Sequence, residues 1–206
     1  MSVNISIAKR LAYAIIAGLF LVSCASSPNG SQTAPATRST TQTSDAEGFD
    51  QYATVKAAVD FLGDSAERIA VIVDKAFKDH GSPNAYIRGE EAGGAFALGV
   101  RYGRGELVTK SGEIRQVFWQ GPSIGFDFGA DGGRVFILVY NLPDSEAIYQ
   151  RFAGVAGSAY FVGGVGMNYQ RSEDIVIAPI RVGIGMRLGA AVGYTHFTRE
   201  SSVNPF

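Results

Sequence analysis

The chain has 206 residues, of which 46% are apolar, 11% aromatic and 18% charged, and its formal net charge is −1. This length suits one well-cored domain, and the composition is that of a β-rich globular protein. Nucleic-acid-binding proteins carry a basic surplus or stripe, which this chain lacks, so we predict no nucleic-acid partner.

Residues 1–23 predict a bacterial lipoprotein signal peptide. Two basic residues precede an apolar run of twelve, 11–22. This run is too short for a transmembrane helix, which needs about 20 residues, and it has the length of a signal-peptide core. It ends in Leu21-Val22-Ser23-Cys24, which resembles the lipobox whose cysteine is acylated. We therefore predict lipidation of Cys24, with a plain signal peptide or an uncleaved anchor as alternatives.

Residues 24–48 predict a flexible tether, because a segment rich in Ser, Thr, Gln, Pro and Gly cannot bury enough apolar surface to fold. Several acyl chains would anchor it stably in a membrane. Ala25 follows the cysteine, and by resemblance to lipoprotein sorting rules this favours the outer membrane. The folded domain is predicted over 49–206.

Two helices are predicted at the start of this domain. The first covers 49–62, and the second begins at Asp64 or Ser65 and ends at Gly81. The second has apolar residues at helical spacing on one face: Ile69, Ile72, Val73, Ala76 and Phe77. Because its polar face has no cationic bias, we expect this helix to pack on a sheet and not on a membrane.

From Tyr86 onward, residues alternate as in β-strands. We predict strands near 85–89, 95–103, 105–110, 113–120, 123–129, 134–140, 159–170, 174–178, 180–189 and 190–198, some of them halves of one bent strand. Hairpin turns are expected at 110–113 and 130–133, and a short helical insertion capped by Asp144 at 143–152. Because 134–140 is almost continuously apolar, we expect both of its faces to be covered, one of them by the second helix.

Of the 26 glycines, 21 lie between residues 89 and 193, many inside predicted strands. Interior glycine allows sharp coiling, bulges or close backbone approach, which small barrels need in order to close. We therefore predict a mainly β (α+β) fold, a small antiparallel β-barrel of about eight strands with one or two N-terminal helices packed on it.

The stretch 180–188 alternates five apolar residues with Arg181, Gly183, Gly185 and Arg187. Burying an unpaired arginine is costly, whereas burying the apolar residues is favourable. We therefore expect the apolar residues to face the barrel interior. The arginines should lie at the surface or pair with acids such as Asp127.

Gly121-Pro122-Ser123-Ile124-Gly125 matches the G-x-S-x-G nucleophile elbow, and Asp174 and His196 follow in the order of a hydrolase triad. The elbow requires a strand before it and a helix after it, whereas a strand-like pattern, 124–128, follows here. We expect a structural corner between strands, and keep a serine hydrolase using Ser123 as a remote alternative.

No metal or cofactor site is predicted, and no catalytic residue. The two histidines lie far apart and lack a cysteine partner. Four acids that could gather around calcium lack the regular loop spacing: Glu90, Glu91, Asp127 and Asp131.

Several long motifs resemble the envelope integrity protein EipA family. They lie at 84–92, 117–129, 139–143, 148–152, 157–164 and 168–171. The resemblance implies a periplasmic small β-barrel associated with the cell envelope of Gram-negative bacteria, and it carries over no catalytic residue. A weaker similarity, glycine-rich strands behind a helix, links the chain to SYLF lipid-binding domains. The lipobox and tether depart from the soluble periplasmic pattern.

We expect a non-enzymatic protein, held by its N-terminal lipid on the periplasmic side of the outer membrane. It should contribute to envelope integrity by binding a protein partner or an envelope glycolipid. The alternative is a barrel that holds a lipid or a small apolar ligand, since about eight strands can enclose one. A wide apolar cavity would favour the ligand, whereas a packed interior with an exposed aromatic patch would favour the partner.

Overall fold

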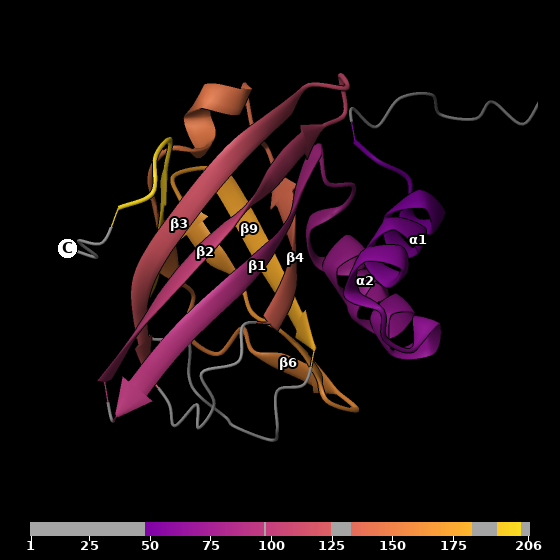
Figure 1. Ribbon diagram of the computed structural model, residues 1–206. Helices are drawn as coiled ribbons and strands as arrows, with labels where there is room; N and C mark the ends of the chain where they lie inside the picture. Colours follow the sequence, from indigo (N-terminus) through magenta and orange to yellow (C-terminus); the bar gives the residue numbers. More distant parts are fainter. Residues whose placement is uncertain (1–47, 97, 125–132, 183–192, 203–206) are drawn as a thin grey trace, which may run out of the picture. The chain divides into compact units, whose positions relative to one another are not determined.

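The computed structural model describes residues 48–96, 98–124, 133–182 and 193–202. Within these ranges two α-helices precede a sheet of ten strands (Figure 1). The elements are α1 (Gln51–Leu62), α2 (Ala66–His80), β1 (Ala85–Phe96), β2 (Leu98–Thr109), β3 (Ile114–Ile124), β4 (Gly133–Tyr140), the 3-10 helix η1 (Ser145–Ile148), β5 (Arg151–Gly154), β6 (Tyr160–Val162), β7 (Val165–Met167), β8 (Gln170–Ser172), β9 (Ile175–Val182) and β10 (Tyr194–Thr198).

Eight of the strands close into an antiparallel barrel. Their order is β4, β1, β2, β3, β10, β5, β8 and β9, and β9 pairs back to β4. β7 lies on the same edge of β9 as β8, and β6 pairs with β7 as a hairpin outside this ring. The predicted small antiparallel barrel of about eight strands is confirmed.

The first two strands are longer than the sequence pattern indicated. β1 and β2 have 12 residues each and pair without interruption from Ala85↔Thr109 to Phe96↔Leu98. Separate strands at 85–89 and 95–103 were therefore the wrong interpretation, because the glycines at 93 and 94 continue β1 instead of ending it. The predicted strand at 159–170 is likewise divided into β6, β7 and β8.

Both predicted helices are confirmed, and the second ends at Gly81 as expected. Asp50 caps α1 by accepting a hydrogen bond of 2.9 Å from the backbone N–H of Ala53. α1 ends at Gly63 and α2 at Gly81, whose φ angles of 70° and 75° glycine adopts without a Cβ penalty. In the described part of the chain, no helix has both the length and the apolar character needed to cross a membrane.

The helices cover one side of the barrel (Figure 1). The apolar face of α2, including Ile69 and Ile72, is fully buried in a cluster with outward-facing residues of β4, β7 and β9. Each such side chain contributes about 1.5–3 kcal/mol on full burial. The strand β4 is therefore covered on both faces, as predicted. Phe136, Leu138 and Tyr140 lie under the helices, whereas Val135, Ile137 and Val139 belong to the interior cluster.

The orientation predicted for the strand at 180–188 was wrong where the structure describes it. Ile180 faces outward beneath the helices, and Arg181 faces the interior, where its Nε donates to Oε2 of Glu91 at 2.7 Å. Because the helices cover the outer face of β9, that face must be apolar too, and an internal acid neutralises the arginine. Residues 183–188 and Asp127 lie outside the described residues.

Candidate binding site in the barrel interior

The interior of the barrel changes character along its strands. The part beneath η1 is apolar and packed, since Ile148 of η1 belongs to the same cluster as Trp119, Phe152 and Phe197. The ring of Phe197 lies 5.7 Å from each of the other two aromatic rings, measured between centroids. Further along β1, β2 and β9, the interior carries charged side chains instead.

Glu91 of β1 is the centre of this charged region. Arg181 of β9 binds its carboxylate through two hydrogen bonds, Nε to Oε2 at 2.7 Å and Nη2 to Oε1 at 3.0 Å. The indole N–H of Trp119 donates to Oε1 at 2.8 Å, and Nε of Arg101 lies 3.7 Å from the same oxygen. Two-point pairing of this kind fixes the guanidinium in one orientation. We name these four residues the Glu91 cluster.

Electrostatics keep Glu91 ionised despite its burial. Desolvation alone would raise the pKa of this carboxyl, but the charges of Arg181 and Arg101 and the hydrogen bonds from Arg181 and Trp119 outweigh it. Together they lower the pKa of Glu91 from 4.5 to about 2. At neutral pH the cluster is therefore an ion pair with a second arginine beside it.

Two glycines make room for the indole of Trp119. A Cβ at Gly103 would lie 2.0 Å from Cε2 of Trp119, and a Cβ at Gly89 would lie 2.5 Å from its Cη2. Both distances are shorter than any contact between non-bonded carbon atoms. Glycine in β1 and β2 therefore allows close approach, one of the three reasons expected from the sequence, and places Trp119 next to Glu91.

Gly103→Ala should lower the free energy of unfolding by about 1–3 kcal/mol, because the added methyl overlaps the fixed indole ring. Urea denaturation measures this loss. Gly133→Ala is the matched control: a Cβ there meets nothing within 4 Å, so its stability should stay within about 0.5 kcal/mol of wild type. Equal losses in the two variants would contradict the packing described here.

Two buried amide side chains have polar atoms without a partner among the described residues, and one of them, Asn168, contacts the Glu91 cluster. Asn168 accepts a hydrogen bond of 3.4 Å from Nη1 of Arg181 through Oδ1, but its Nδ2 has no partner among the described residues. Gln170 pairs with Ile177, which belongs to the interior cluster, and its Oε1 also lacks a partner in the described structure. Their exposed fractions are 8% and 2%. Buried polar atoms usually have a partner, and an ordered water can supply one.

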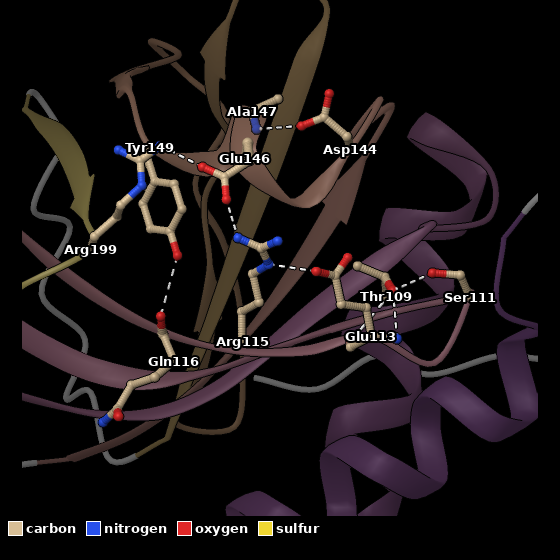
Figure 2. A network of polar contacts seen from close by, with 10 residues as sticks. All are labelled: Thr109, Ser111, Glu113, Arg115, Gln116, Asp144, Glu146, Ala147, Tyr149 and Arg199. Carbon is tan, nitrogen blue, oxygen red and sulfur yellow. Dashed lines mark hydrogen bonds and ion pairs between the residues drawn. The ribbon is translucent and has the colours of Figure 1, made fainter.

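A surface network of ion pairs and hydrogen bonds involves η1 at the opposite end of the barrel (Figure 2). Glu146 of η1 pairs with Arg115 of β3 and with Arg199, which follows β10. Arg199 also lies over the ring of Tyr149, 4.5 Å from its centroid. Asp144 caps η1 as predicted, accepting from the N–H of Ala147 at 2.9 Å. These contacts hold η1 against the apolar end of the interior.

The proposed hydrolase residues are not arranged as the motif requires. Ser123 lies inside β3, paired with position 99 of β2, whereas a nucleophile elbow places serine at the turn after a strand. His196 of β10 pairs with Gln120, three positions before Ser123, and Asp174 lies in the turn between β8 and β9. The structural corner expected at this stretch was also wrong, because β3 continues without a break from Ile114 to Ile124 and Ser123 lies within it.

The remaining predicted sites have different outcomes. Cys24 lies outside the described residues, so its lipidation remains a prediction. No group of three or more His, Cys, Asp or Glu side chains that could hold a metal occurs in the part of the chain that the structure describes. The adjacent acids Glu90 and Glu91 face opposite sides of β1, since Glu90 lies near Arg104 at the surface.

The Glu91 cluster was missed as a site by sequence reasoning. Glu91 was considered only as a calcium ligand, and Arg181 was expected at the surface or paired with an acid such as Asp127. Strand alternation could have indicated which way Glu91 faces. It places Glu91 on the same face of the strand as Gly89, two residues before it, and Ile87, four residues before it. Its pairing with Arg181 joins residues 90 positions apart, which no local pattern reveals.

Comparison with known proteins shows similarity to a protein family and to a solved structure. A family model described as envelope integrity protein A matches residues 47–206. A beta-barrel-like protein of Brucella abortus, whose crystal structure is known, is 48% identical in sequence and superimposes with a TM-score of 0.71. That similarity covers 78% of this chain and 100% of the Brucella abortus chain. No match was found among curated proteins.

Proposed function

The chain belongs to the envelope integrity protein A family and has a role associated with the cell envelope, and from this we propose that it is a lipid-anchored, non-enzymatic binding protein. Its partner would be an envelope protein or a glycolipid on the periplasmic side of the outer membrane. The observation that carries the proposal is the family match over the whole folded domain, 47–206, behind a lipobox ending in Cys24.

The outer face of β1, β2 and β3 supports a role in binding a macromolecule. The described helices pack on β4 and β9, whereas this face has a groove of about 540 Å³ with charged walls. Arg88 and Glu106 pair across it at 2.8 Å, and Ile114 at its rim is 58% exposed. An exposed apolar side chain beside paired charges is a composition common at transient protein interfaces.

The interior favours a polar ligand over an acyl chain, which bears on the alternative function. Trp119, Phe152 and Phe197 fill the apolar part of the barrel in the described structure, where a lipid tail would have to lie. The charged Glu91 cluster instead offers hydrogen-bond donors. A barrel that binds a small polar molecule is therefore the second candidate function.

Lipid anchoring is tested by labelling cells with radioactive palmitate. The wild-type chain should carry the label and fractionate with the outer membrane, because acyl chains on Cys24 would hold it there. The Cys24→Ala variant should carry no label and should be absent from the outer-membrane fraction. In a strain that lacks the wild-type protein, it should restore resistance of the envelope to detergent less well than the wild-type chain does. A wild-type chain without label, or an alanine variant that keeps it, would contradict anchoring at this site.

A further inference from the structure

A second pocket lies outside the barrel, where the C-terminal part of α2 meets the chain around β6 and β7. Its volume is about 490 Å³, which is within the range of small-molecule sites. Lys75 and Asp79 of α2 line it, together with Met167 and Tyr169, two buried residues of the cluster beneath the helices. The segment 156–159, Ala-Gly-Ser-Ala, lines it with short side chains. We name this site the α2 pocket.

The fold holds the polar groups of the α2 pocket in place. The hydroxyl of Tyr169 donates to Oδ2 of Asp79 at 2.7 Å, and Lys75 pairs with the same oxygen. The hydrogen bonds from Lys75 and Tyr169 lower the pKa of Asp79, so this carboxyl is ionised at neutral pH. Ser158 accepts from the backbone N–H of Tyr169 at 3.0 Å and donates to the carbonyl of Val155 at 2.7 Å. The pocket is therefore formed before a ligand arrives, which lowers the entropic cost of binding.

Both charged groups keep hydrogen-bonding capacity for a ligand. The contacts of Asp79 with Lys75 and Tyr169 both use Oδ2, and a carboxylate accepts through two oxygens. An ammonium group has three donors, and Lys75 gives one of them to Asp79. The side chains of Lys75 and Asp79 are 39% and 28% exposed, so a ligand in the pocket can reach them.

This pairing of opposite charges favours a neutral ligand with neighbouring hydroxyl groups. An anion would have to compete with Asp79 for Lys75, and a cation would have to compete with Lys75 for Asp79. Two adjacent hydroxyls fit without breaking the pair, because one donates to the carboxylate and the other accepts from the ammonium group. The apolar side chain of Met167 offers a surface for C–H groups of the same ligand. Adjacent hydroxyls on a ring with C–H faces are the chemistry of a sugar.

We propose that the α2 pocket binds a sugar unit of an envelope glycan, with its hydroxyls on Lys75 and Asp79. The sugar belongs either to the headgroup of a glycolipid or to a glycan strand of peptidoglycan. This inference rests on the proposed binding function and deepens it, since it gives the glycan a place on the protein.

Calorimetric titration of the full chain, purified in a detergent without a sugar headgroup, tests the proposal. The probes are the polysaccharide released from lipopolysaccharide by mild acid and soluble glycan strands of peptidoglycan. We expect saturable binding of at least one of them. Trp119 is the only tryptophan of the chain and belongs to the interior cluster, so its emission should stay unchanged when a sugar binds outside the barrel.

Asp79→Asn tests the role of the carboxylate, because it removes the charge and one acceptor without changing the size of the side chain. Affinity should fall at least tenfold. Asp60→Asn is the matched control, since Asp60 pairs with Lys56 in the same i, i+4 arrangement on α1, and it should bind as wild type does. Lys75→Gln should bind several-fold more weakly. Melting temperatures of the three variants show whether the fold is kept.

The outcomes separate the two sources of the sugar. Binding of the lipopolysaccharide glycan, weakened in Asp79→Asn, assigns a glycolipid headgroup, and the same result with the other probe assigns peptidoglycan. The inference is overturned by a wild-type chain that binds neither probe, by unchanged affinity in folded Asp79→Asn and Lys75→Gln variants, or by a shift in tryptophan emission that places the sugar in the barrel. None of these results changes the palmitate labelling of Cys24, so failure of the inference is distinguishable from failure of the proposed function.

Discussion

Arg181→Ala should lower the free energy of unfolding by about 3–5 kcal/mol, because it leaves the carboxylate of Glu91 buried without its two-point partner. The exposed fraction of Glu91 is 9%, so water cannot replace the lost hydrogen bonds fully. Truncating the arginine also removes packing of its aliphatic stem. Urea denaturation, followed by circular dichroism, gives the change in unfolding free energy.

Arg88→Ala is the control for this experiment. Arg88 also pairs with a glutamate across neighbouring strands, Glu106, but the two side chains are 43% and 51% exposed. Surface pairs of this kind contribute about 0–1 kcal/mol, so this variant should stay within that range. A loss in Arg181→Ala as small as that in Arg88→Ala would mean that the interior pair is hydrated, and would weaken the case for a structured polar interior.

Stability should fall by about 3 kcal/mol between pH 5 and pH 2 through Glu91 alone. The pKa of Glu91 is about 2 in the folded protein against 4.5 as its ordinary value. A group whose pKa is lowered on folding contributes stability above its unfolded pKa and loses it as pH falls towards the folded one. The size follows from about 1.4 kcal/mol for each unit of pKa difference.

Glu91→Gln isolates this contribution, since surface carboxyls titrate in the same range. The variant should be less stable than wild type at pH 7, and the difference should shrink as pH falls from 5 to 2. Unfolding free energies of both proteins at several pH values measure it. A difference that stays constant over this range would show that protonation of Glu91 does not destabilise the fold.

The helices and the strand-rich character of the chain could be predicted because their causes are local. The apolar face of the helix at 66–80 requires a partner, and the stop at Gly81 follows from the positive φ that glycine adopts there. The strand at 134–140 has no alternation that would identify its inner face. Because it is continuously apolar, both of its faces are predicted to be buried. Those statements need no knowledge of which strands are neighbours.

The interior site could not be predicted in the same way. Period-two alternation divides the residues of β9 into two faces but does not say which face is inside. Because helices cover the outer face, that face is apolar too, so hydrophobicity does not identify the inner one. Arg181 was therefore assigned to the wrong side. Only the register that brings β9, β7 and β1 together around Glu91 determines its position, and that register depends on closure of the whole ring.

The position of β10 in the ring determines the order in which the protein can fold. β10 lies between β3 and β5, so His196 near the C-terminus pairs with both Gln120 and Arg151. A chain made from its N-terminus can form the meander of β1, β2 and β3 early, because these strands are joined by short turns. Their free edge stays open to wrong pairing until the C-terminal strand arrives. Completion of the ring is therefore a late, non-local step, of the kind that makes β-proteins fold slowly.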